Sequence, residues 1–163
     1  MTSDRIEKKI LLRASRERVW RAVSDSAEFG RWFGARFDGP FVAGRSLRGR
    51  IVPTEMDAEV AEQQKPYDGM EFEVRVEQIE PMRRLAFRWH PYAVDVKDFA
   101  TEPTTLVTFE LAEAAGGILL SIVESGFDAI PLARRAEAFK ANEEGWDAQT
   151  RLVQKYLAAQ TTA

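Results

Sequence analysis

Residues 70–81 read MEFEVRVEQIEP, and from Met70 to Glu77 they alternate apolar with charged side chains, which is the two-residue period of a β-strand. The charged residues fall on one face, and the apolar residues fall on the other: Met70, Phe72, Val74 and Val76. A strand of this kind has one buried and one wet side, as in an antiparallel sheet that is covered on a single face. The stretch therefore predicts a sheet whose apolar face must be covered by another element.

The same alternation recurs on both sides of this strand. Downstream it continues through residues 83–91, 104–113 and 116–126, and four successive strands of this kind indicate an antiparallel meander. Upstream, residues 5–13 and 45–53 also read as strands. The proline at the end of 45–53 is expected to end that strand or to leave it at a sheet edge.

Two short helices are expected after the first strand. Ser15 is placed to cap the first, RERVWRAVSD, and Ser26 is placed to cap the second, AEFGRWFG. The polar and acidic residues 54–69 follow neither period and predict a long loop with room for a short helix. Because long loops in compact domains often carry function, we interpret this one as a lid over the core.

A helical period governs the C-terminal residues 142–160. Asn142, followed by two glutamates, is typical of a helix N-terminus. The apolar side chains form one broad stripe with the amide of Gln149 at its centre. This helix is the only predicted element long enough to cover the sheet. We therefore predict a single α+β domain over residues 1–163, in which a curved antiparallel sheet of about six to seven strands wraps around the long C-terminal helix.

Composition restricts the partners and the chemistry. The 163 residues carry a net charge of −3 without a basic run, so nucleic acid is not an expected partner. With no cysteine and a single histidine, thiolate catalysis and iron–sulfur clusters are excluded, and neither a metal nor another cofactor is expected. No apolar run reaches the ~18 residues of a membrane span, and the charged N-terminus lacks the apolar core of a signal peptide. These features predict a cytoplasmic protein.

Five segments of the sequence occur in an order that a known family shares. They are ASRERVWRAVSDSAEFGRWFG (14–34), VEQIEPMRRLAFRW (76–89), TLVTFEL (105–111), ESGFD (124–128) and NEEGWDAQTRLVQKYL (142–157). Together they resemble the activator-of-heat-shock-protein-90-ATPase-homologue-1-like domains, a family within the START-related, birch-pollen-allergen-like (SRPBCC) superfamily. The resemblance extends over nearly the whole chain.

The resemblance implies a helix-grip fold, in which a curved antiparallel sheet wraps a long C-terminal helix around a cavity. In many relatives that cavity accepts hydrophobic or amphipathic small molecules. Members range from binding and transfer proteins to cyclases and hydrolases, so the resemblance implies no catalytic set. The family name also implies a chaperone partner and a role in the stress response.

Glu124 is the candidate for a polar group inside such a cavity. It shares strand parity with Leu120 and Ile122, so it points inward if they do. A carboxylate in an apolar space is costly unless it is paired, hydrogen-bonded or reached by water. Glu124 is therefore either the polar anchor or general acid of a pocket, or a wet residue at the sheet rim that bonds to the turn at Ser125–Gly126.

Trp146 and Gln149 lie on the stripe of the covering helix. In one interpretation they line the pocket and orient a ligand; in the other the indole fills the core and the amide bonds a strand carbonyl. His90 has the opposite parity to Trp89 and is expected to face solvent, and no catalytic triad can be assembled on it. Four aromatic residues form either an entrance to the cavity or a closure of the sheet's open end: Trp20, Phe29, Trp32 and Phe33.

We interpret the protein first as a binding module, not an enzyme, for a small hydrophobic or amphipathic molecule held between the sheet and the C-terminal helix. The predicted ligand-binding residues are Phe72, Val74, Phe87, Trp89, Val107, Phe109, Leu120, Ile122, Glu124, Trp146, Gln149 and Val153. Two alternatives stay open: a cavity enzyme of the cyclase or hydrolase type that uses Glu124 as acid or base, and a co-chaperone or stress-response protein that acts through its surface. A homodimer also stays open, because the strand at 45–53 is expected at a sheet edge.

Overall fold

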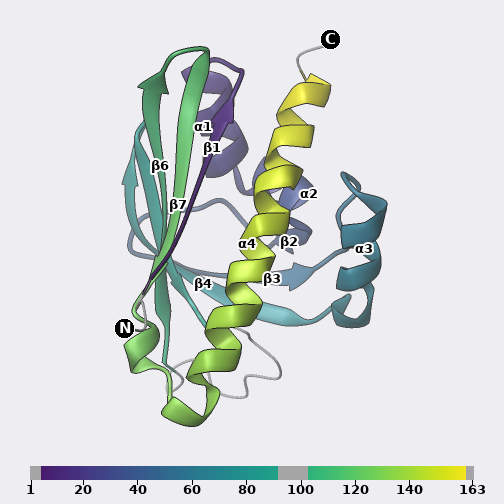
Figure 1. The fold of residues 1–163 in the computed structure, drawn as a ribbon, viewed down its shortest axis with the longest axis vertical. Coiled ribbons are helices and arrows are strands. Elements are labelled where there is room, and N and C mark those ends of the chain that lie inside the picture. Colours follow the sequence, from purple (N-terminus) through teal and green to yellow (C-terminus); the bar gives the residue numbers. More distant parts are fainter. Residues whose placement is uncertain (1–4, 92–102, 161–163) are drawn as a thin grey trace.

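The computed structural model describes residues 5–91 and 103–160, which form a curved antiparallel sheet and a long C-terminal helix (Figure 1). The sheet has seven strands in the order β1-β7-β6-β5-β4-β3-β2, and every neighbouring pair is antiparallel. The strands are β1 (Arg5–Leu12), β2 (Ala35–Phe37), β3 (Ser46–Ile51), β4 (Glu71–Glu80), β5 (Arg84–Trp89), β6 (Thr105–Ala114) and β7 (Gly117–Ser125). The predicted α+β helix-grip fold, a sheet that curves around a C-terminal helix, is confirmed.

The helices lie on the concave side of the sheet and beyond its β2 end (Figure 1). They are α1 (Arg16–Ser24), α2 (Ser26–Phe33), α3 (Ala58–Gln64) and α4 (Leu132–Gln160), with short 3-10 turns η1 (Lys65–Tyr67) and η2 (Phe127–Ala129). Among the described residues, no helix is both long and apolar enough to cross a membrane.

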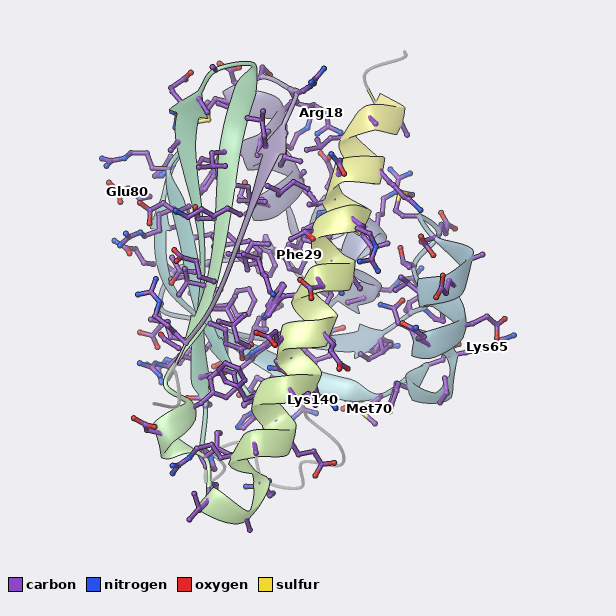
Figure 2. The ribbon with its side chains drawn as sticks, in the orientation of Figure 1. Arg18, Phe29, Lys65, Met70, Glu80 and Lys140 are labelled. Atoms are coloured by element: carbon purple, nitrogen blue, oxygen red, sulfur yellow. The ribbon has the colours of Figure 1, made fainter. Side chains whose placement is uncertain are left out.

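The core fills the space between the sheet and α4. Figure 2 shows Phe29 between the two layers, whereas Lys65 and Glu80 project outward. The alternation that predicts the sheet is visible in β7, where every second residue from Ile118 to Glu124 is buried. Apolar burial of this extent is the main force that holds α4 against the sheet.

Of the two N-caps predicted for the short helices, one is confirmed and the other is wrong. The Ser15 side chain accepts a hydrogen bond from the Arg18 N–H, so the predicted cap of α1 is confirmed. The prediction that Ser26 caps α2 is wrong: Asp25 is the cap. Its carboxylate accepts from two N–H groups of the first turn at 2.9 and 3.1 Å, and Ser26 instead donates to the carbonyl of Gly39.

The C-terminal helix begins ten residues before the predicted position, so the prediction that Asn142 is its N-cap is wrong. Helix α4 starts at Leu132, directly after Pro131, and residues 132–141 are mostly strong helix formers. The helix therefore passes through Asn142 without a break. The side chain of Asn142 instead donates hydrogen bonds across the core to Glu124.

The region before β4 corrects two further expectations. Strand β3 is not at the sheet edge, because the three-residue strand β2 pairs with it and residues 35–37 are too few to show an alternation. The edges are β1 and β2. Residues 54–69 contain α3 and η1, so more of this loop is helical than its polar sequence indicates.

Candidate functional site

Glu124 lies inside the domain near the end of β7 and is 0% exposed. Its neighbours of the same parity, Leu120 and Ile122, are buried in the core, so the inward orientation expected from the sequence is confirmed. The alternative of a wet residue at the sheet rim is wrong. The reason is that α4 begins earlier than expected and extends across the end of β7.

The carboxylate of Glu124 accepts five hydrogen bonds from four side chains. Trp146 Nε1 donates to Oε1 at 2.9 Å, and Trp89 Nε1 donates to Oε2 at 2.8 Å. The hydroxyl of Thr105 donates to Oε2 at 2.5 Å, and the amide of Asn142 reaches both oxygens at 2.9 Å. These donors come from β5, β6 and α4, and in the described ranges all of them are neutral.

This arrangement makes Glu124 a fastening point between the sheet and α4. A carboxylate has about four lone-pair positions, and four donor groups already occupy them. The two indole rings that bond it also stack on each other, with ring centres 5.7 Å apart and planes 29° apart. Phe33 packs against both rings at 5.9 and 6.1 Å.

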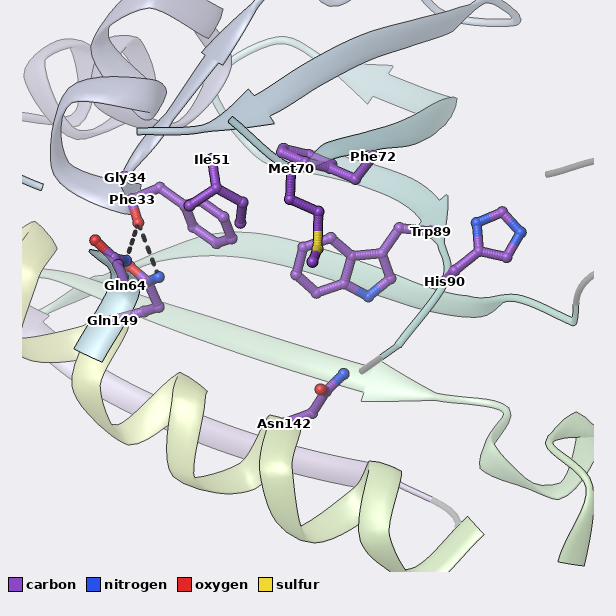
Figure 3. A pocket seen from close by; sticks show the side chains of 10 residues that line it. All are labelled: Phe33, Gly34, Ile51, Gln64, Met70, Phe72, Trp89, His90, Asn142 and Gln149. Atoms are coloured by element: carbon purple, nitrogen blue, oxygen red, sulfur yellow. Dashed lines mark hydrogen bonds between the residues drawn. The ribbon is translucent and has the colours of Figure 1, made fainter. Parts of the chain in front are cut away.

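A pocket of about 220 Å³ lies next to this cluster, between α4, the strands β3 and β4, and the end of β5 (Figure 3). Its walls are mostly aromatic or aliphatic. The lining residues are Phe33, Gly34, Ile51, Gln64, Met70, Phe72, Trp89, His90, Asn142 and Gln149. Glu124 is not among them, but two of its donors, Trp89 and Asn142, are. The carboxylate therefore holds part of the pocket wall without facing the pocket.

Two glutamines meet at one end of the pocket, where both donate to the backbone carbonyl of Phe33 at 3.0 Å (Figure 3). The side-chain oxygen of Gln64 accepts a hydrogen bond from the Thr54 N–H at 2.8 Å. The side-chain oxygen of Gln149 is buried and accepts no hydrogen bond from the described part of the chain. Because a carbonyl can only accept, the Phe33 oxygen requires the nitrogen of the Gln149 amide to face it. The orphan atom of Gln149 is therefore its acceptor oxygen.

Helix α3, which ends at Gln64, closes one side of the pocket. Asp57 caps this helix by accepting from the N–H groups of Glu59 and Val60, and its second oxygen accepts from Lys155 of α4 at 2.5 Å. Lys155 first, and the helix N–H groups next, hold the pKa of Asp57 below its usual range. The segment that the sequence suggests as a lid thus contains a short helix, and an ion pair between Asp57 and Lys155 joins this helix to α4.

A second polar contact anchors α4 to the first two helices. The hydroxyl of Tyr156 donates to Glu28 at 2.7 Å, and the same carboxylate pairs with Arg18 at 2.9 Å and Arg21 at 2.7 Å. Burial, and then the hydrogen bond to Glu28, raises the pKa of Tyr156. The guanidinium groups of Arg18 and Arg31 each lie 5.5 Å from the centre of the Tyr156 ring.

The structure brings some of the sequence-predicted residues to the pocket and places others behind it. Phe72, Trp89 and Gln149 line the pocket, and Trp146 lines a smaller one beside it. The remaining apolar predictions are packed side chains of the core that line neither pocket: Val74, Phe87, Val107, Phe109, Leu120, Ile122 and Val153.

The prediction that His90 faces solvent is wrong, because this residue is only 9% exposed and lines the pocket. Strand β5 ends at Trp89, and side-chain alternation does not extend past the last residue of a strand. Of the four aromatic residues proposed for an entrance or a closure, Phe29 and Trp32 are fully buried in the core. Only Phe33 reaches the pocket.

Sequence reasoning missed three pocket residues that no strand or stripe pattern marks. Gln64 ends α3 in a stretch that the sequence predicts as a loop, Gly34 follows α2 with a positive φ of 96°, and Asn142 reads as a helix cap. Gly34 is the sequence signal that could have indicated this end of the pocket, because a left-handed glycine after a helix turns the chain and exposes the preceding carbonyl. Among the described residues, no group of three or more histidine and acidic side chains is arranged to hold a metal ion.

Comparison with known proteins gives one family and many similar folds. The family model for "Activator of Hsp90 ATPase homolog 1-like protein" matches residues 13–158. No curated protein sequence matches the chain.

Three solved structures illustrate the similarity of fold. DynU16, from the dynemicin biosynthetic locus, is 24% identical over 96% of this chain and 48% of its own, with a TM-score of 0.68. This chain thus spans about half the length of DynU16. MLL2253 from Mesorhizobium loti is 19% identical over 95% and 97% of the two chains, with a TM-score of 0.70. The Aha1 dimer from Colwellia psychrerythraea is 14% identical over 94% and 95%, with a TM-score of 0.65.

Proposed function

The chain belongs to the family of activator of Hsp90 ATPase homolog 1-like proteins, and we propose that the pocket between α4 and the sheet binds a small, mainly apolar molecule. The molecule donates one hydrogen bond, from a hydroxyl or an N–H group, to the side-chain oxygen of Gln149. No chemical step is required of the protein in this proposal.

The orphan oxygen of Gln149 is the observation that carries the proposal. A buried acceptor without a donor costs about 1–3 kcal/mol, and native proteins seldom tolerate this without a reason. The amide nitrogen is held by the Phe33 carbonyl at 3.0 Å, so the oxygen cannot turn away to find another partner. A ligand with one donor would satisfy it.

The walls around this oxygen favour an apolar body for the ligand. Five lining side chains supply aromatic rings, an aliphatic chain and a thioether: Phe33, Ile51, Met70, Phe72 and Trp89. An apolar cavity of about 150 Å³ accepts benzene, and this pocket measures about 220 Å³. The space therefore suits a substituted single ring or a small two-ring molecule.

Two probes that differ by one hydroxyl test this proposal. We expect 4-ethylphenol to bind more tightly than ethylbenzene, by about twofold to tenfold, because a neutral hydrogen bond contributes about 0.5–1.5 kcal/mol. The dissociation constants are measured by NMR titration of the tryptophan indole N–H signals. Gln149→Leu should abolish the preference for the phenol while it retains affinity for ethylbenzene.

The matched control is Gln154→Leu, a change of the same kind on the exposed side of α4. It should leave both dissociation constants as they are in the native protein. A failure of both probes to bind would overturn the proposal. So would a preference for the phenol that persists in Gln149→Leu.

The two alternative functions have less support. For acid–base chemistry by Glu124, both oxygens are already engaged by four donors, and the residue does not line the pocket. For a co-chaperone role, the support is the family name alone. A pull-down with the chaperone ATPase, and an assay of its ATP hydrolysis with and without this protein, tests that alternative.

A further inference from the structure

A smaller pocket of about 100 Å³ continues the first one along α4. The two share four lining residues: Phe33, Trp89, Asn142 and Gln149. The smaller pocket adds Ala141, Gly145 and Trp146. The two pockets lie side by side along α4, and we call them together the channel; its α4 wall includes Gln149, Gly145 and Ala141.

Gly145 lies in the interior of α4 and on the wall of this channel. A glycine within a helix is less stable than alanine, so its presence calls for a reason. Packing is not the reason here, because a β-carbon at this position would meet nothing within 4 Å. At Gly30 the situation differs, since a β-carbon there would lie 2.2 Å from the carbonyl oxygen of Ala35.

The spacing of three lining residues on α4 gives the channel its direction. Ala141, Gly145 and Gln149 are four residues apart, so they lie one above the other on a single face of α4. Eight residues of helix cover about 12 Å. Gly145 itself is exposed, so the channel reaches the surface there.

We infer that the missing side chain at Gly145 makes room for the tail of an elongated amphipathic ligand. This inference rests on the proposed function and extends it. The hydroxyl or N–H end of the ligand bonds Gln149, its ring or body fills the larger pocket, and an unbranched apolar chain passes over Gly145 to the surface. Gly145 therefore determines the length of molecule that the protein accepts.

The test compares 4-ethylphenol with 4-pentylphenol on the native protein and on two variants. We expect the native protein to bind 4-pentylphenol roughly tenfold more tightly, which corresponds to burial of about two additional methylene groups. Gly145→Leu should remove this gain and leave the dissociation constant of 4-ethylphenol within about twofold, because the shorter probe does not reach position 145. Gly145→Ala should raise the melting temperature of the unliganded protein and still weaken binding of 4-pentylphenol. A role in helix stability alone would not give these opposite effects.

The control is Glu144→Leu, which places the same leucine side chain at the neighbouring exposed position outside the channel. It should preserve the preference for the longer phenol. If 4-ethylphenol binds and 4-pentylphenol binds no better, or if Gly145→Leu weakens both probes equally, the inference about Gly145 is overturned while the proposed function stands. If neither phenol binds the native protein, both fail together. Should Gly145→Leu not fold, Gly145→Ala carries the same comparison.

Discussion

Replacing Glu124 by glutamine changes one oxygen of the buried carboxylate to an NH₂ group and keeps the size of the side chain. The two indole N–H groups bond different oxygens, Trp146 on Oε1 and Trp89 on Oε2. An indole has a single donor and cannot accept in its place. Whichever way the new amide turns, one tryptophan therefore faces a donor instead of an acceptor.

The other two partners can adapt in part. The hydroxyl of Thr105 can rotate, and the amide of Asn142 can turn over to present its oxygen. The expected loss is thus dominated by one indole N–H left buried without an acceptor, at about 1–3 kcal/mol, and by weaker bonds to a neutral acceptor. We expect Glu124→Gln to lower the free energy of unfolding by about 2–4 kcal/mol.

The assay is urea unfolding followed by far-ultraviolet circular dichroism, which reports mainly the helix and sheet content. Glu110→Gln is the matched control: this residue lies on β6 and forms an exposed ion pair with Arg84 at 2.9 Å. Exposed pairs of this kind contribute about 0–1 kcal/mol. If Glu124→Gln is no less stable than Glu110→Gln, the fastening role is refuted, because the cost of burying the carboxylate would then cancel its hydrogen bonds.

Three further predictions concern other contacts of the helices. Gly30→Ala should lower the free energy of unfolding by about 1–3 kcal/mol in urea titrations, despite the better helix propensity of alanine, because its β-carbon would collide with the Ala35 carbonyl. In thermal unfolding at neutral pH, Asp57→Asn should be less stable than the native protein but more stable than Asp57→Ala, because asparagine keeps the helix cap and loses only the ion pair. Since the pKa of Asp57 is lowered by its lysine partner and then by helix N–H groups, its contribution should be present above the usual carboxyl pKa and be lost only as the pH falls through the lowered value. Tyr156→Phe should lower the free energy of unfolding by about 1 kcal/mol at neutral pH. Because burial and the hydrogen bond to Glu28 raise the pKa of Tyr156, this difference in stability should persist up to pH ~10 and disappear as the pH rises further.

The sheet and its buried face were predictable because alternation depends only on neighbouring residues of the same strand. The pattern at 70–81 gives the apolar face of β4, and the parity of β7 gives the inward direction of Glu124. Strand parity does not predict which side chains donate hydrogen bonds to Glu124. They come from β5, β6 and α4, and contacts between elements so far apart in sequence leave no local pattern.

The pocket was less predictable because its distinctive groups lie at the ends of elements. His90 follows the last residue of β5, Gly34 follows the last residue of α2, and Gln64 is the last residue of α3. Periodicity is informative within an element and is lost at its boundary. Asn142 shows the same limitation in another form, because a residue type favoured at helix caps here lies within a helix and donates a hydrogen bond across the core.

The most direct test of the central claim is a crystal structure of the protein with 4-ethylphenol. We predict that the ring lies among Phe33, Phe72 and Trp89 and that the phenolic oxygen lies within hydrogen-bonding distance of the side-chain oxygen of Gln149. A structure in which an ordered water bonds that oxygen and the phenol is absent from the pocket would contradict the claim.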